Sequence, residues 1–298
     1  MNATLHLAIT FALCTLLVRP LARARWVWRS PRTGILLWQM LLVTWVLCVV
    51  GAAFAIGLSP YGRDIPSALG RWLGDDPRPA GFTALHVAGL VAGFVLTAAL
   101  VVGLVWSWVR VVRVRRRHRD MLALVAREDS GLPGVLILDH PLAVAYCLPG
   151  LRARVVFSTG TLSTLSEREL SAVLAHERTH ARERHDLVLL PFVALRRLLP
   201  ASRLSARAAE AVALLVEMRA DEGACRTQGA GSLAHALRRL TRVAVSPPPG
   251  AIGIADGGVD ARLSRLGGGA GPLPLWLRWL VLVGGVVLVS TPLSFLAV

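Results

Sequence analysis

The chain has 298 residues, of which 54% are hydrophobic and 17% are charged. With a mean hydropathy of +0.58, this composition is too apolar for a soluble domain of this length and favours a membrane protein. The formal net charge of +15 would suit a nucleic-acid-binding protein, but much of it stands in Arg blocks beside apolar runs, without a recognition motif. We therefore expect these Arg residues to face a lipid bilayer, with no direct nucleic-acid partner.

Four apolar runs are long enough to cross a bilayer as helices, because a hydrocarbon core of about 30 Å needs about 20 residues. The runs cover about 3–19, 34–58, 82–109 and 275–297. No Arg precedes the first run, so it is expected to remain a membrane span rather than to act as a cleaved signal peptide. We expect a three-span membrane region over 1–119 and a fourth transmembrane helix over 275–298.

Arginine between the runs predicts which side of the membrane each segment faces, because basic residues are retained on the cytosolic side. The segments from Arg19 to Arg32 and from Arg110 to Arg119 contain Arg and no acid. The intervening segment, about 59–81, balances its charges, with Arg63, Arg71 and Arg78 against Asp64, Asp75 and Asp76. We therefore expect a multi-pass protein of the plasma membrane with both termini outside and residues 120–274 in the cytosol.

The polar segment 120–245 is predicted to form an α+β domain. Its expected elements are a short helix at 121–127, strands at 135–139, 143–148 and 155–158, and helices at about 187–200, 203–227 and 231–244. Pro149-Gly150 indicates a hairpin between the last two strands. Ser166 and Glu169 form a capping-box pattern that starts a further helix. Pro and Gly dominate 246–274, which we expect to be a flexible linker to the last span.

The helix that begins after Ser166 carries the sequence His176-Glu177-Arg178-Thr179-His180. Two His four residues apart project from one face of a helix, so their nitrogens can occupy neighbouring corners of a tetrahedral zinc site. Glu177 is placed to accept a proton from a zinc-bound water. We favour this interpretation over two structural histidines. His185 and Asp186 follow this helix in the chain, and the sequence leaves two roles open for them: a structural role, or contact with the residues that bind the metal.

A catalytic zinc ion needs a third protein ligand and an open position for water. Glu217 and Asp221 are four residues apart on the helix expected at 203–227. Glu217 could bind the metal, and Asp221 could accept the remaining N–H of a ligand His and fix its tautomer. Glu210 and Glu222 are the other acidic candidates, but neither is followed by an acid four residues later.

Together these features resemble the BlaR/MecR-type (antirepressor) membrane metallopeptidases. The resembling runs are 145–150, 155–160, Glu169-Leu170, 176–180, 184–186 and 217–221. The resemblance implies a predominantly α membrane protein with a cytosolic α+β zincin-like domain between its third and fourth spans. It also implies a gluzincin site, in which His176, His180 and Glu217 bind one catalytic Zn2+ and Glu177 is the general base. The implied substrate is a cytosolic regulator, typically a small winged-helix repressor.

The activating signal and the partners stay open. Family members that sense β-lactams carry a penicillin-binding domain after the last span, whereas this chain ends at Val298, so we expect another signal or a partner. An extended substrate is expected to add to the edge of the hairpin at 143–158, with Tyr146 or Arg219 near the oxyanion. The alternatives are an HtpX-type quality-control protease, whose zinc motif lies between its second and third spans, and a non-catalytic signalling scaffold. A homodimer is left open.

Overall fold

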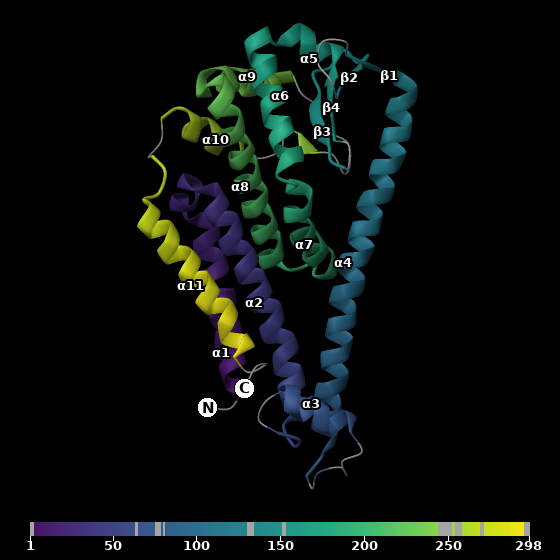
Figure 1. Ribbon diagram of the computed structural model, residues 1–298, viewed down its shortest axis with the longest axis vertical. Helices are drawn as coiled ribbons and strands as arrows, with labels where there is room; N and C mark the ends of the chain where they lie inside the picture. The colour runs from purple at the N-terminus through teal and green to yellow at the C-terminus, as the bar shows by residue number, and fades with distance from the viewer. Residues whose placement is uncertain are drawn as a thin grey trace. The chain divides into compact units, whose positions relative to one another are not determined.

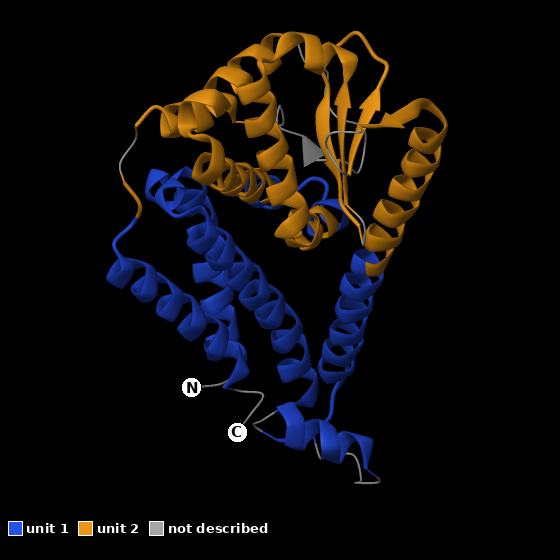
Figure 2. Cartoon of the chain, turned by 45° about the horizontal axis from the view of Figure 1, so that its top comes forward, with its two compact units in different colours: residues 1–104, 195–208, 273–298 blue, residues 105–194, 209–272 orange. Residues whose placement is uncertain are grey.

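The computed structural model describes residues 3–62, 65–74, 79, 81–129, 134–150, 153–243, 252–253, 258–268 and 271–294. The chain divides into two compact units, coloured separately in Figure 2. Unit 1 comprises Met1–Leu104, Leu195–Ala208 and Leu273–Val298, and unit 2 comprises Val105–Ala194 and Ala209–Pro272. Most of the charged residues of the balanced segment at 59–81 lie outside the described residues, as do Leu151 and Arg152 of the predicted hairpin turn.

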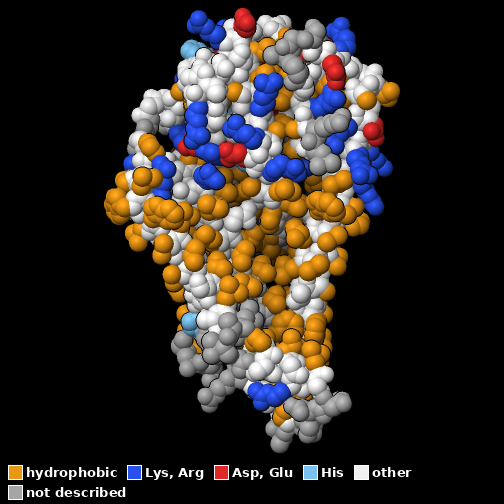
Figure 3. Space-filling view, viewed as in Figure 1, with side chains coloured by type: hydrophobic (Ala, Val, Ile, Leu, Met, Phe, Trp, Pro, Cys, Tyr) orange, Lys and Arg blue, Asp and Glu red, His pale blue; other side chains and the backbone are white. Residues whose placement is uncertain are grey.

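Unit 1 is built from long apolar helices. They are α1 (Ala3–Arg23), α2 (Pro31–Leu58), the first half of α4 (Ala84–Val125) and α11 (Leu275–Leu293), with the 3-10 helix η1 (Arg25–Arg29) and the short α3 (Ile65–Leu73) between them. Within the described residues, α1, α2, α4 and α11 are long and apolar enough to cross a membrane. Figure 3 shows apolar side chains covering much of their outer surface. The four apolar runs of the sequence therefore correspond to four helices with the character of membrane spans.

The helices of unit 1 pack closely along α2. Both α1 and α11 lie against it, and Trp45 Nε1 donates a hydrogen bond to Thr15 Oγ1 across the first of these contacts at 3.2 Å. Where α2 meets α4, an added Cβ at Gly57 would lie 2.6 Å from the backbone nitrogen of Leu90. One at Gly89 would lie 2.7 Å from the backbone nitrogen of Gly57. Glycine is therefore required at this crossing, as is common between membrane helices.

The helix α4 continues past its apolar half into unit 2. The sequence predicted a separate helix at 121–127, but α4 runs unbroken from Ala84 to Val125. The segment from Arg110 to Arg119 contains no Pro or Gly, and Arg is a good helix former, so nothing ends the helix there. Leu122 near its end packs against the sheet of unit 2. The Arg-rich segment is therefore a rigid helical part of the polar domain rather than a loop.

The sheet of unit 2 has the strand order β1-β2-β4-β3-β5. Its strands are β1 (Ala126–Glu128), β2 (Val135–Leu138), β3 (Ala145–Leu148), β4 (Arg154–Ser158) and β5 (Ile252–Gly253). β2 and β4 run parallel, and the other pairs are antiparallel. The predicted hairpin is confirmed, because β3 pairs antiparallel with β4, with Ala145 opposite Phe157. The edge of the hairpin to which an extended substrate was expected to add is occupied at Tyr146 and Cys147, because β5 pairs with β3 there.

Helices cover both faces of this sheet. In Figure 1 the helices α5 (Thr159–Thr164), α6 (Glu167–Arg182), α7 (His185–Leu198), α8 (Arg203–Gln228) and α9 (Ala230–Val243) follow β4 in the chain. Val155 and Phe157 of β4 face the core that includes residues of α6 and α9. Val156 faces the opposite side, against Leu122 of α4. This alternation is expected for a strand whose two faces are both buried.

The segment predicted to be a flexible linker contains structure that the sequence analysis missed. β5 and α10 (Val259–Leu266) both lie within 246–274, whereas Pro247 to Pro249 lie outside the described residues. Val259, Leu263 and Leu266 pack against the core of unit 2. Their spacing of four and three residues is that of one helix face. The Pro and Gly content of the whole segment concealed this short amphipathic pattern.

The crossing of α6 and α8 requires a glycine at position 223. An added Cβ there would lie 2.2 Å from Thr179 Oγ1, a distance that real contacts do not reach. We expect Gly223→Ala to lower the free energy of unfolding by about 1–3 kcal/mol, as other overpacking substitutions do. The denaturant midpoint of the full chain in detergent would measure this change.

The matched control for this prediction is Gly231→Ala on α9. An added Cβ at Gly231 meets nothing within 4 Å, and Ala favours a helix by up to about 1 kcal/mol over Gly. This variant is expected to be as stable as the wild type or slightly more stable. Equal midpoints for Gly223→Ala and the wild type would contradict the close helix crossing.

Candidate metal centre

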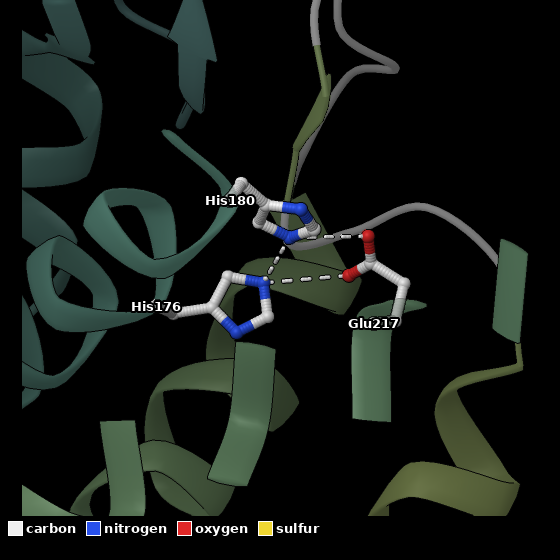
Figure 4. Close-up of side chains that lie close together, drawn as sticks. All are labelled: His176, His180 and Glu217. Atoms are coloured by element: carbon white, nitrogen blue, oxygen red, sulfur yellow. Dashed lines mark hydrogen bonds and ion pairs between the residues drawn. The ribbon is translucent and has the colours of Figure 1, made fainter. Parts of the chain in front are cut away.

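Two histidines of α6 form the first part of the candidate metal centre. The helix begins with a complete capping box, in which the Ser166 side chain accepts from the Glu169 backbone N–H and the Glu169 side chain accepts from that of Ser166. His176 and His180 lie one turn apart in the second half of this helix, and both are fully buried. Their Nε2 atoms lie 3.1 Å apart (Figure 4). The helix thus presents two imidazole nitrogens to one point inside unit 2.

Glu217 of α8 completes a three-residue cluster. Its Oε2 lies 3.4 Å from His176 Nε2, and its Oε1 lies 3.3 Å from His180 Nε2. Zinc binds imidazole nitrogen and carboxylate oxygen at about 2.0–2.2 Å, so neighbouring tetrahedral ligand atoms lie about 3.3–3.5 Å apart. The separations in the cluster are close to these values. The residues therefore fit a zinc ion held by His176, His180 and Glu217, the only such group of three or more potential ligand residues among the described residues.

The second nitrogen of each histidine is also held. His176 Nδ1 lies 3.0 Å from Asp221 Oδ1, within ion-pair distance, which leaves Nε2 as the metal-facing atom. His180 Nδ1 lies 3.0 Å from Nδ1 of His185. If His180 keeps its hydrogen on Nδ1, it donates to His185, and its Nε2 is again free to bind a metal. Fixing both tautomers in this way is a common property of zinc sites.

Glu177 lies next to the first histidine, and its side chain is completely buried. Burial would lower the pKa of the Arg262 guanidinium, but the carboxylates of Glu217 and Asp221 raise it, and the negative charge of Glu177 adds to this rise. Glu177 therefore shares the electrostatic environment of the cluster without being one of its three candidate ligands. A buried carboxylate beside a metal site is suited to accept and release a proton.

Arg262 of α10 is the residue of the site that sequence reasoning missed. Its side chain is fully buried, and its Nη1 forms an ion pair with Glu217 Oε2 at 2.9 Å. Its Nε and Nη2 form a two-pronged interaction with the Asp221 carboxylate, at 2.9 and 2.7 Å. One guanidinium thus binds both the candidate ligand carboxylate and the carboxylate that orients His176. Arg262 is positioned by an apolar helix face that packs against the core, formed by Val259, Leu263 and Leu266. This pattern lies within the segment that was predicted to be a linker.

The other acidic candidates lie away from the cluster. Glu222 is paired with Arg219 and Arg265, and Glu210 is exposed on α8. Arg219 also binds the Glu183 carboxylate through two nitrogens, at 2.9 and 2.6 Å. Its guanidinium is therefore engaged by carboxylates rather than placed to meet an oxyanion.

The remaining residues of interest have partners of their own. The Tyr146 hydroxyl lies 2.7 Å from His118 Nε2. The structure places His185 against His180, with its Nε2 3.6 Å from Glu183 Oε2. Asp186 is buried and accepts from Arg115 at 2.9 Å. His185 thus contacts a candidate ligand directly, whereas Asp186 ties α7 to α4.

The charges around the cluster shift the pKa values of its members in different directions. Burial alone would lower the pKa of His176, but its bonds to Asp221 and Glu217 raise it to about 9. Burial and the positive charge of His176 lower the pKa of His180 well below its ordinary value. Burial would raise the pKa of Asp221, but Arg262 and His176 lower it to about 2. Burial lowers the pKa of His185 to about 4. His180 and His185 are therefore neutral near pH 7, and His176 carries the proton.

These pKa values predict that zinc binding releases a proton. A ligand histidine must be neutral, and His176 without metal is protonated below about pH 9. At about pH 6, where a zinc-bound water with a pKa of about 7 keeps its proton, we expect close to one proton to be released for each zinc ion, and the apparent affinity to fall about tenfold for each pH unit below about 7. Calorimetric titration in two buffers of different ionisation enthalpy would count the proton. A binding enthalpy that is the same in both buffers would contradict it.

Comparison with known proteins finds a family model that matches part of the chain. Residues 112–246 match the model of Peptidase family M48, whose members are zinc-dependent peptidases. The match includes His176, Glu177, His180, Glu217 and Asp221, and it ends before Arg262. No solved structure matches the chain. The match and the geometry together support a metallopeptidase domain, and the described part of the chain also contains four helices that are long and apolar enough to span a membrane.

Proposed function

We propose that this protein is an integral-membrane zinc endopeptidase that hydrolyses peptide bonds of a cytosolic protein. The observation that carries the proposal is the buried cluster of His176, His180 and Glu217, whose facing atoms have the spacing of a tetrahedral zinc site. The M48 match over the same segment supports a peptidase rather than a structural metal site. The alternative of a non-catalytic signalling scaffold is disfavoured, because the chain has the candidate general base Glu177, buried beside the cluster.

The residues have separate roles in the proposed reaction. When bound, zinc polarises the scissile carbonyl and lowers the pKa of water to about 7. Glu177 accepts a proton from the attacking water and transfers it to the leaving amine. Asp221 keeps the hydrogen of His176 on Nδ1, and Arg262 holds the carboxylates of Glu217 and Asp221 in place. The burial of these groups strengthens each of these interactions.

The location and the substrate class belong to the same proposal. The Arg content beside the first and third apolar runs supports a plasma-membrane protein with unit 2 in the cytosol and both termini outside. The resemblance to BlaR/MecR-type metallopeptidases suggests a small winged-helix repressor as substrate. An HtpX-type quality-control protease would use the same chemistry on misfolded membrane proteins. The two functions differ in the substrate and not in the site.

Substrate capture would test the proposal. The full-length Glu177→Gln variant, expected to hold zinc and bind substrate without cleaving it, would be cross-linked in native membranes and purified. We expect enrichment of a small cytosolic DNA-binding protein, which the zinc-loaded wild type then cleaves and the chelated wild type does not. Enrichment of unrelated membrane proteins would support quality control instead. The absence of zinc-dependent cleavage of any captured protein would reject the peptidase proposal.

A further inference from the structure

Unit 2 contains a cavity of about 300 Å³ away from the three-residue cluster. It lies between the C-terminal half of α4, the end of β3 and the beginning of α7. Side chains that line it include Trp108, Arg115, Arg116, Arg119, Arg184 and Leu187. The proposed peptidase reaction uses none of these residues, so the cavity requires a separate explanation.

The charge of the cavity wall is strongly positive. Four of its lining residues are Arg and one, Asp186, is acidic. Two of the guanidiniums are held in place, since Arg115 donates to Asp186 at 2.9 Å and Arg119 donates to the carbonyl of Pro149. Arg116 is exposed at the rim. A wall in which guanidiniums outnumber carboxylates favours an anionic ligand, and phosphate matches the donor geometry of Arg especially well.

The residue that precedes α7, Arg184, has an unusual backbone conformation. Arg184 is the only residue other than glycine, among the described residues, with a positive φ, at 50°. Left-handed backbone at a residue with a long side chain costs free energy, and Arg184 adopts it at the end of α6, directly after the C-cap residue Glu183. Here it places a fourth guanidinium on the cavity wall, 3.5 Å from Asp186.

The other part of the wall is apolar and exposed. Trp108 and Leu187 line the cavity and have 52% and 47% of their surface exposed. Trp108 lies on α4, which continues directly from the apolar half that could span a membrane. Tryptophan at the end of such a run prefers the depth of lipid headgroups. A ligand that fits both parts of the wall carries a negative group and a hydrocarbon chain.

We propose that this cavity binds one anionic phospholipid, with its phosphate among the Arg side chains and its acyl chains along Trp108 and Leu187. Inorganic phosphate would match the Arg residues but not the exposed apolar side. An acidic peptide would match the charge, but it would not account for the position of the cavity on a helix that continues from an apolar run. The lipid site is independent of the peptidase reaction, and its test needs no catalytic activity.

The test compares two variants that remove the same charge from the same helix. Arg116→Gln changes a lining residue, whereas Arg117→Gln changes an exposed neighbour that does not line the cavity. The full-length proteins, in neutral detergent, would be titrated with phosphatidylglycerol or phosphatidylcholine and the bound lipid counted by native mass spectrometry. We expect one bound phosphatidylglycerol, about tenfold or more weaker binding in Arg116→Gln because a charge-assisted bond is lost, and an affinity within about twofold of the wild type in Arg117→Gln.

Three outcomes would overturn the proposal. Equal affinities in the two variants would show general attraction between charges rather than a site. Equal binding of phosphatidylcholine would remove the requirement for an anionic headgroup. Displacement of the lipid by inorganic phosphate at matched concentration would show a simple anion site. Equal zinc content in both variants and the wild type would show that the fold of unit 2 is preserved in each case.

Discussion

Replacing Glu177 with Gln is expected to lower the rate of peptide hydrolysis by about 10²- to 10⁴-fold, the usual contribution of a positioned general base. Gln keeps the size of the side chain but cannot accept the proton of the attacking water. The three atoms that face the proposed metal belong to His176, His180 and Glu217, so the variant is expected to keep one zinc ion. The measurements are zinc content by elemental analysis and the cleavage rate of the captured substrate.

The control for this substitution is Glu167→Gln, at the exposed beginning of the same helix. It removes the same charge far from the cluster and is expected to leave both zinc content and cleavage rate unchanged. Loss of zinc from Glu177→Gln would assign that carboxylate to the metal rather than to the proton. Full cleavage by this variant would reject Glu177 as the general base.

The parts of the site that could be predicted from the sequence depend on spacing along single helices. The four-residue separation of His176 and His180 fixes their common face once the capping box at Ser166 starts the helix. The same separation links Glu217, which reaches the cluster, to Asp221, which reaches His176 Nδ1. Local patterns of this kind need no knowledge of the tertiary fold.

The parts that could not be predicted depend on contacts between distant segments. Arg262 stands 41 residues from Asp221 in the chain, and their bond forms only because α10 packs against the core of unit 2. The pairing of β5 with β3 likewise joins residues that a local pattern does not connect. Composition was misleading in this region, because a Gly-rich and Pro-rich segment can still contain a helix of eight residues. A buried Arg can be recognised only when its acidic partners are already placed.

The largest expected effect on stability comes from Arg262→Met. Met fills a similar volume but leaves the buried carboxylates of Glu217 and Asp221 without the guanidinium that now binds both. Removing one partner of a buried ionic group costs about 3–5 kcal/mol, because an uncompensated charge remains in the interior. In the metal-free protein we therefore expect the free energy of unfolding to fall by about this amount. Denaturant titration of the full chain in detergent with a chelator would measure it.

Zinc should reduce the effect of this substitution. A divalent cation between His176, His180 and Glu217 supplies positive charge to the same carboxylate, and ligand binding to the folded state adds its own stabilisation. The difference between Arg262→Met and the wild type is therefore expected to be smaller with saturating zinc than with chelator. The control is Arg265→Met on the same helix, whose partly exposed pair with Glu222 contributes about 0–1 kcal/mol. If the two variants lost equal stability, or if zinc left the deficit of Arg262→Met unchanged, Arg262 would be a packing residue of α10 rather than the counter-charge of the metal-binding carboxylate.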